Sequence, residues 1–322
     1  MKVLQLVTSS RPFFDQQVSS LERRGVECTV LGVPGEYRGD STRGPLDYAR
    51  FYPKVLREVQ TGAYDLVHAN YGLVAPFALA QPTRPIVLTL WGTDLMSERE
   101  WLQSISRYGA QAVDAVVVPS PAMSATLDVD HRLIPFGVDT AQFRPIPKAD
   151  ARERVGWDTD APVALFPYDR SRDVKDYPRA RRLVEQVDAD VELRTVSGVA
   201  HEEIPYYMNA SDLLLVTSRR ESGPMIVKEA AACNLPIVST DVGFVRETID
   251  DVAGCVVSDR DEELRSGIEW IAETNVHSNG RERVQSLSLD AMGESLHELY
   301  HDVLDRHPAT PSPNREEVGH RV

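Results

Sequence analysis

Short runs of apolar, often β-branched residues alternate along the chain with longer stretches whose apolar positions recur at helical spacing. This alternation is typical of parallel strands joined by helices. The helical pattern is clearest from Phe14 to Arg24 and from Pro45 to Thr61. The first half predicts strands at Val3 to Val7, Glu27 to Leu31, Leu66 to Ala69, Ile86 to Leu90, Ala115 to Pro119 and Arg132 to Ile134.

The alternation restarts after a charged, proline-containing stretch from Asp139 to Trp157. Further strands are expected at Val163 to Pro167, Val191 to Val196, Leu213 to Thr217, Ile237 to Thr240 and Cys255 to Val257. The restart predicts an α/β fold of two doubly wound, Rossmann-like domains. Open α/β sheets bind ligands at the carboxyl ends of their strands, so two facing domains predict a site in the cleft between them.

The length of 322 residues also favours two domains, because a single core rarely grows beyond roughly 250–300 residues. We place the first domain at residues 1–143 and the second at residues 144–289. A last helix is expected within residues 290–306. Residues 307–322 are rich in proline and polar side chains, which predicts a disordered tail.

The net charge of -14 is unevenly distributed. Residues 1–144 hold 14 basic and 15 acidic side chains, whereas residues 145–322 hold 21 and 34. A general nucleic-acid binder needs a basic face and is excluded. A nearly neutral first domain suits peripheral contact with an anionic membrane, although a solvated acidic surface on the second domain is the simpler interpretation.

The chain contains neither an apolar run of membrane-spanning length nor a signal-peptide pattern at its start, so we expect a cytoplasmic protein. The cysteines, Cys28, Cys233 and Cys255, are far apart and have no metal-ligand spacing. They are predicted to be buried free thiols.

Two glutamates, Glu221 and Glu229, flank an apolar run that is otherwise typical of a core strand and helix. A strand to Thr217, a turn and a helix from Pro224 to Cys233 are expected here, with Ser222 as a candidate N-cap. Such a turn directs free backbone N–H groups towards a phosphate. Taken singly, Glu221 could instead favour the helix dipole, and Glu229 could be an exposed helix residue.

This segment and several others occur in the order found in a known family. They are ESGPMIVKEAAACNLPIVSTDVG at 221–243, DLVHAN at 65–70, TLWGTD at 89–94, AVDAVVVPS at 112–120, IPFGVD at 134–139, KDYP at 175–178 and ASDLLLVTS at 210–218. Together they resemble the retaining glycosyltransferases of GT-B fold, group 1 and family-four-like class, whose E-x7-E motif the first segment matches. The last helix resembles the one that crosses back to the first domain in that family.

The resemblance implies a nucleotide-sugar donor, a UDP- or GDP-sugar, bound without a cofactor or metal. Glu229 would bind the ribose hydroxyls, and Glu221 a donor-sugar hydroxyl. Lys175 and an arginine before it, Arg170 at the commoner spacing or else Arg172, would stabilise the diphosphate. The other implied donor-binding residues are Ser222, Gly223, Pro224, Met225, Ile226, Gly243 and, in the TSSRP loop of the first domain, Ser10.

The chain departs from the family at several positions, one of which is Phe244, where a second glycine is usual after Gly243. Trp91 stands where many members have a histidine linked to catalysis, and Phe136 replaces a common asparagine. Tryptophan transfers no proton, but its ring can stack on a sugar. His68 and Asp94 then remain as polar catalytic candidates facing the same cleft, although His68 is also compatible with a purely structural role.

The resulting prediction is a retaining, metal-independent transfer of a sugar to an unidentified acceptor, which is a glycan, a glycolipid or a small molecule. The resemblance implies that the acceptor attacks from the face from which the diphosphate leaves, and that the leaving phosphate takes the proton. Two alternatives stay open. One is a nucleotide-sugar 2-epimerase. The other, motivated by Trp91 and Phe136, is a catalytically impaired partner that binds a nucleotide sugar or a glycan.

Overall fold

The computed structural model describes residues 1–35, 43–97, 99–221 and 223–307. The chain forms two compact units, each of which is described by itself. Unit 1 contains Met1–Val117, Asp128–Arg132 and the chain from Gly293 onward, and unit 2 contains Val118–Leu127 and Leu133–Met292. The boundary between Met292 and Gly293 falls inside the last helix. Unit 1 therefore contains residues from the start of the chain and from this helix.

The sheet of the first half has the strand order β2-β1-β3-β4-β5-β6. The pairs β1–β2, β1–β3, β3–β4 and β4–β5 are parallel. Its inner strands are buried along almost their whole length, because helices cover both faces of such a sheet. The strands are β1 (Lys2–Val7), β2 (Glu27–Gly32), β3 (Leu66–Asn70), β4 (Ile86–Thr89), β5 (Ala115–Val118) and β6 (Arg132–Leu133).

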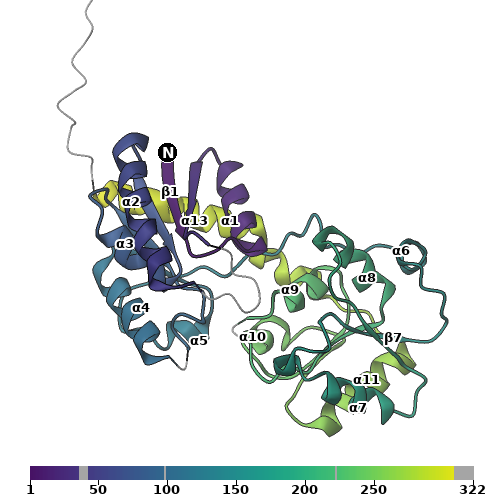
Figure 1. Cartoon of the computed structure of the whole chain (residues 1–322). Helices are drawn as coiled ribbons and strands as arrows, with labels where there is room; N and C mark the ends of the chain where they lie inside the picture. Colours follow the sequence, from purple (N-terminus) through teal and green to yellow (C-terminus); the bar gives the residue numbers. More distant parts are fainter. Residues whose placement is uncertain (36–42, 98, 222, 308–322) are drawn as a thin grey trace, which may run out of the picture. The chain divides into compact units, whose positions relative to one another are not determined.

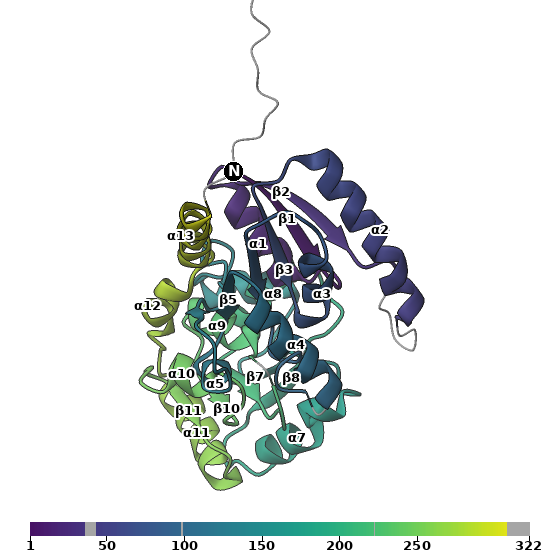
Figure 2. The same ribbon diagram turned by 90° about the vertical axis from the view of Figure 1, so that its left-hand side faces the viewer.

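The helices of unit 1 pack against this sheet, and Figure 2 shows α3 and α4 next to each other. Proline stands at the first or second position of α1, α2 and α3, where a missing N–H costs little. The helices are α1 (Pro12–Glu22), α2 (Pro45–Gly62), the 3₁₀ turn η1 (Gly72–Val74), α3 (Ala75–Leu79), α4 (Glu100–Ala112) and, from Gly293 onward, the larger part of α13 (Leu289–Arg306).

The sheet of unit 2 has the strand order β11-β10-β9-β7-β8, and its neighbouring strands are parallel. Successive residues of a strand point to opposite faces, and both faces here are apolar. Leu214 and Val216 pack with α8, α9, α10 and α12, whereas Leu213 and Leu215 pack with α7 and α11. The strands are β7 (Val163–Phe166), β8 (Glu192–Thr195), β9 (Leu213–Val216), β10 (Ile237–Ser239) and β11 (Cys255–Val257).

These two helical layers make unit 2 doubly wound, and α7 and α11 lie side by side (Figure 1). The helices are α5 (Pro121–Ser124), α6 (Lys148–Val155), η2 (Asp173–Lys175), α7 (Tyr177–Glu185), η3 (His201–Glu203), α8 (Ile204–Ala210), α9 (Met225–Ala232), α10 (Val245–Ile249), α11 (Asp261–Thr274), α12 (Gly280–Val284) and η4 (Gln285–Leu287). The predicted fold of two Rossmann-like α/β domains is confirmed.

Residues 133–143, which the sequence analysis places in the first domain, pack instead with unit 2. The Val138 N–H donates to the Leu287 carbonyl, and the Leu289 N–H donates to the Val138 carbonyl, both at 2.9 Å. Phe143 is fully buried in the unit 2 core. The boundary lies earlier because these contacts join the IPFGVD segment to residues far along the chain, which proline and charge content cannot indicate.

Within the described residues, helices are too short or too polar for any of them to cross a membrane. Peripheral contact of the first domain with a membrane stays a prediction. The cysteines are free thiols, with Cys233 buried and Cys28 and Cys255 half-buried. His307, at the start of the predicted tail, lies 3.0 Å from Asp114, and residues 308–322 lie outside the described part of the chain.

Candidate functional site

The loops that follow three adjacent strands of unit 2 bring the predicted donor residues together. β7 ends at Phe166, β9 at Val216 and β10 at Ser239, and these strands are neighbours in the order β10-β9-β7. Because the strands are parallel, the loops after them meet at the same edge of the sheet. These loops carry Lys175, Glu221 and Gly243, which are far apart in sequence.

Lys175 and Glu221 form an ion pair at this edge. The Lys175 ammonium contacts Glu221 Oε1, to which the Ser218 hydroxyl also donates at 2.8 Å. Lys175 is 4% exposed, and its ammonium lies 3.8 Å from the centre of the Tyr168 ring. Burial lowers the pKa of Lys175, and the bond to Glu221 opposes this shift. A buried ammonium that depends on one carboxylate can exchange that partner for a phosphate.

The two candidate arginines have different surroundings. The Arg170 Nε donates to the Thr195 hydroxyl at 3.0 Å, and its guanidinium stacks on Tyr177 at 4.9 Å. The charge of Arg172 lies close enough to Lys175 to contribute to lowering the pKa of that lysine. Arg172 is exposed and therefore accessible to an anion beside Lys175. The geometry favours Arg172 as the second cation of this site.

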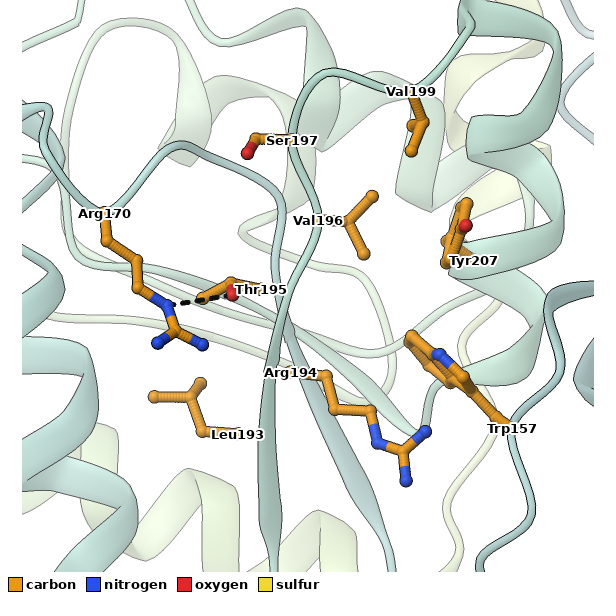
Figure 3. Close-up of a pocket in the computed structure, with 9 residues that line it drawn as sticks. All are labelled: Trp157, Arg170, Leu193, Arg194, Thr195, Val196, Ser197, Val199 and Tyr207. Carbon is orange, nitrogen blue, oxygen red and sulfur yellow. Dashed lines mark hydrogen bonds between the residues drawn. The ribbon is translucent and has the colours of Figure 1, made fainter.

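Arg170 also lines a separate cavity of about 400 Å³ along the edge strand β8. Figure 3 shows Arg170 and Thr195 on one side of this strand, with Val196, Tyr207 and Trp157 on the other. Lys175, Glu221 and Glu229 are not among the residues lining the cavity. The cavity is therefore a neighbour of the charged site and not part of it.

Glu229 lies on α9 and is 8% exposed. The His201 Nε2 lies 3.2 Å from Glu229 Oε1, and Gln142 Nε2 lies 3.3 Å from His201 Nδ1 and donates to the His201 carbonyl at 3.0 Å. With the proton on Nε2, the ring donates to Glu229 while Nδ1 accepts from Gln142. The bond to Glu229 raises the pKa of His201. The alternative that Glu229 is an exposed helix residue is wrong.

The start of α9 differs from the prediction. Pro224 occupies the N-cap position, without a side-chain hydrogen bond, and the candidate cap Ser222 lies outside the described residues. Pro224 is buried, and Met225 and Ile226 are half-buried in the first turn. At the other end of the helix, Asn234 has a left-handed backbone, with φ of 56°.

Gly223 and Gly243 allow two loops to approach each other. Gly243 has φ of 59°, and a Cβ there would lie 2.9 Å from the Gly223 nitrogen. A Cβ at Gly223 would overlap the ring of Phe244, which is 5% exposed and contacts the Lys228 ammonium at 4.4 Å. Phe244, at the position of the family's second glycine, therefore covers part of this turn.

His68 in unit 1 is fully buried in β3. Its Nδ1 lies 2.6 Å from the Tyr300 hydroxyl, and its Nε2 lies 2.7 Å from the Thr89 hydroxyl. Burial lowers its pKa to about 3, so the ring is neutral near pH 7. The prediction that His68 faces a ligand cleft is wrong, because the fold encloses the ring and both nitrogens have partners.

Asp94 is also fully buried. Its carboxylate accepts backbone N–H groups from Gly72 at 2.9 Å, Trp91 at 3.0 Å and Gly92 at 2.9 Å. Burial raises its pKa, and these hydrogen bonds oppose the shift. Asp94 holds the turn after β4, so the prediction that it faces a cleft as a catalytic group is wrong.

Trp91 is half-buried in unit 1 and packs edge to face against Phe13, with ring centres 4.8 Å apart. The Tyr71 ring lies 5.7 Å away, and the backbone of Tyr71 has an unusual φ of 97°. These aromatic residues follow β1, β3 and β4, at the carboxyl edge of the first sheet. Ser10, in the loop after β1, is exposed and donates to Asp15.

Two family models match this chain in succession. The model described as Glycosyltransferase Family 4 matches residues 13–142, and the model described as Glycosyl transferases group 1 matches residues 173–286. The chain belongs to the group 1 glycosyltransferases. The first match covers most of unit 1, and the second covers Lys175, Glu221 and Glu229 of unit 2.

Named relatives agree with this assignment. The D-inositol 3-phosphate glycosyltransferase of Frankia alni is 26% identical over 63% of this chain and 64% of its own length. The chain spans 57% to 64% of the length of the first curated relatives that this group 1 glycosyltransferase matches.

Solved structures show the same fold. Sucrose-phosphate synthase from Thermosynechococcus elongatus has a TM-score of 0.77 at 18% identity, covering 95% of this chain and 100% of that structure. Anabaena HepE, solved with UDP and glucose, has a TM-score of 0.70 at 16% identity, covering 94% and 100%. The GT-B architecture of two Rossmann-like units is thereby shown for this group 1 glycosyltransferase.

Three residues of the site were not singled out from the sequence. Tyr168 and Ser218 each lie within two residues of a strand end, a position that marks ligand-facing residues in α/β sheets. His201 has no such signal, because it lies in η3 and reaches Glu229 across 28 positions of sequence. Only the packing of unit 2 brings His201 to that carboxylate.

Proposed function

We propose that the protein transfers a sugar from a UDP- or GDP-sugar to an acceptor hydroxyl, with retention at the anomeric carbon. The observation that carries the proposal is the ion pair of Lys175 and Glu221 at the carboxyl edge of the second sheet. Its ammonium matches a diphosphate, and its carboxylate matches a sugar hydroxyl. Family membership supports the reaction class.

Each charged group has a role in this reaction. Lys175 and Arg172 bind the diphosphate and stabilise the charge that develops on it as the glycosidic bond breaks. Glu221 accepts a hydrogen bond from a hydroxyl of the donor sugar. Glu229, held by His201, accepts hydrogen bonds from the ribose.

The bond changes balance without a protein base. The bond from the anomeric carbon to the diphosphate oxygen breaks, and a bond from that carbon to the acceptor oxygen forms on the same face. The acceptor proton passes to the leaving phosphate oxygen. This assignment is compatible with Trp91 in place of a histidine, because no side chain then has to take the proton.

The two opposite charges of this site neutralise each other. Lys175 is nearly buried, and an unpaired ammonium there would be costly, so the carboxylate of Glu221 serves as its partner. When a donor enters, its phosphate replaces Glu221 at the ammonium, and its sugar replaces Lys175 at the carboxylate. Both groups keep a partner throughout the exchange.

The test measures binding and turnover with a panel of UDP- and GDP-sugars. Turnover is detected as released nucleoside diphosphate, and the sugar product is then identified. We expect Lys175→Ala and Glu229→Ala each to lower donor binding or turnover by at least a hundredfold. Lys148→Ala is the matched control, because Lys148 pairs with Asp212 at 2.5 Å, away from the strand ends used here.

Near-normal kinetics in both variants would contradict the site assignment. Release of an epimerised sugar without transfer would replace the proposal by the epimerase reaction. Activity that is lost with EDTA and restored by Mn²⁺ would contradict the metal-independent part of the proposal.

A further inference from the structure

Tyr168 follows β7 by two residues and is 8% exposed. Its ring packs edge to face on Phe166 at 5.3 Å, and the Lys175 ammonium lies 3.8 Å from its centre. Within the described part of the chain, the Tyr168 hydroxyl has no hydrogen-bond partner. A buried phenol without a partner is uncommon, because folding removes its bonds to water without replacing them.

The hydroxyl lies among the carboxylates of the donor site. Burial raises the pKa of Tyr168 well above its ordinary value, and the charges of Glu221 and then Glu229 raise it further. The Ser218 hydroxyl is near enough to Tyr168 to oppose this rise in pKa. It donates its hydrogen to Glu221, however, and the Tyr168 hydroxyl has no partner among the described residues. The free donor group therefore lies next to an ion pair that has to open when a ligand binds.

The ring of Tyr168 contacts Lys175 while Lys175 is paired with Glu221, whereas its hydroxyl can act once a ligand separates this pair. The Tyr168 ring faces the Lys175 ammonium, and this ammonium contacts Glu221 Oε1. Once a diphosphate takes the ammonium, this oxygen keeps the Ser218 hydroxyl but loses its cation. The neighbouring Tyr168 phenol can then donate to this carboxylate alongside the hydroxyl of the donor sugar.

We infer that Tyr168 is a positioning residue whose hydroxyl donates to Glu221 in the donor-bound state and keeps that carboxylate directed at the sugar. The inference rests on the proposed function. It assigns to Tyr168 a part in recognising the sugar and not the nucleotide. It also explains how folding tolerates an unsatisfied hydroxyl, since the bond forms only with the ligand.

The experiment compares Tyr168→Phe with wild type in two measurements. Without ligand, the variant loses an unsatisfied hydroxyl, so its Tm should stay equal or rise by about 2–4 °C. Affinity for UDP and GDP should change by less than twofold. The affinity gained from the sugar, measured as the ratio of Kd values for UDP and UDP-glucose or for GDP and GDP-mannose, should fall about fivefold.

Tyr64→Phe is the matched control. The Tyr64 hydroxyl donates to Glu58 at 2.5 Å in unit 1, so its removal should lower the Tm and leave both nucleotide ratios unchanged. The combination with Glu221→Gln adds a test of positioning. If Tyr168 acts through Glu221, then Tyr168→Phe should have no further effect on the ratio in that background.

The inference is overturned if Tyr168→Phe lowers the Tm as Tyr64→Phe does, if its sugar ratio equals that of wild type, or if its effect adds fully to that of Glu221→Gln. A wild-type protein that binds none of these four nucleotides overturns the proposed function and the inference together. Wild-type binding with an unaffected Tyr168→Phe ratio overturns the inference alone.

Discussion

The carboxyl edges of the two sheets use polar residues in opposite ways. In unit 2, the carboxylates and cations after the strands pair with each other, as Lys175 does with Glu221 and His201 with Glu229. In unit 1, Asp94 and His68 are fully buried and are bound by backbone or hydroxyl groups of the fold. The half-buried side chains at that edge are aromatic, and Trp91 packs between Phe13 and Tyr71.

This difference separates residues that serve a ligand from residues that serve the fold. A pair of side chains can open for a ligand, because each partner is replaceable. A carboxylate that accepts three backbone N–H groups cannot, because opening it would leave those donors unsatisfied. Strand-end position alone is therefore insufficient evidence for a functional residue.

The largest expected effect distinguishes the two edges directly. Asp94→Asn places N–H donors against backbone N–H groups and should lower the free energy of unfolding by about 3 kcal/mol or more. Glu221→Gln keeps an amide oxygen as an acceptor for Lys175, so it should lower the free energy of unfolding less than Asp94→Asn does, but it should reduce turnover at least a hundredfold. Denaturant unfolding and steady-state kinetics measure both. A stable, inactive Asp94→Asn would break the comparison.

The next effect concerns the buried polar chain of unit 1. Tyr300 on α13 lies 2.6 Å from His68 Nδ1, and its hydroxyl accepts a hydrogen bond from Gln5 at 3.1 Å. Tyr300→Phe should therefore lower the free energy of unfolding by about 2 kcal/mol, because two polar partners stay buried. Nucleotide affinity should be unchanged. A loss of affinity without a loss of stability would contradict the structural role.

A smaller, pH-dependent effect is expected for His201. Its folded-state pKa is raised by Glu229, so its stabilising contribution is fully present below the ordinary pKa of about 6.5 and is lost as the pH rises through the raised value. The Tm difference between wild type and His201→Asn should therefore shrink from pH 6 to pH 9. A Tm difference that is constant with pH would show that protonation of His201 does not contribute to stability through Glu229.

The same comparison for His68 should have the opposite slope, since burial lowers the folded-state pKa of this ring to about 3, and the unfolded ring gains a proton as the pH falls towards about 6.5. His68→Asn, measured over the same pH range, is thus the matched control for His201→Asn.

The smallest effect is expected for Trp91. Trp91→Phe keeps an aromatic ring beside Phe13 and should leave affinity for UDP and GDP unchanged. If this edge binds the acceptor, transfer should fall by about two- to fivefold through a higher KM for the acceptor. Competition assays with simple glycosides measure this change. Weaker donor binding would contradict the assignment of donor binding to the edge of unit 2 alone.

The sequence predicted the strands within one or two residues, because buried parallel strands are continuous apolar runs bounded by turns. It also predicted that Lys175 and Glu221 belong to one site, through the family motifs. It could not distinguish Arg170 from Arg172, because the difference lies in contacts with Thr195 and Tyr177.

The same limit explains the errors for His68 and Asp94. A polar residue at the end of a strand has the same sequence pattern whether it points to solvent or into the fold. His68 is enclosed by Tyr300, which is 232 positions away in sequence, and no local pattern indicates that contact. The domain boundary was misplaced for a similar reason, since the partners of Val138 are Leu287 and Leu289.

The composition of unit 1 has a consequence for biosynthesis. Tyr300, fully buried and bound to Gln5 of β1 and His68 of β3, belongs to a segment that is translated after the strands of both sheets. The first sheet therefore leaves the ribosome long before the side chain that completes its polar interior. Until then Gln5 and His68 lack their hydrogen bonds to Tyr300, so a nascent chain that stops before Tyr300 should bind chaperones through the incomplete unit 1, whereas unit 2 closes its core with residues made before Gly293.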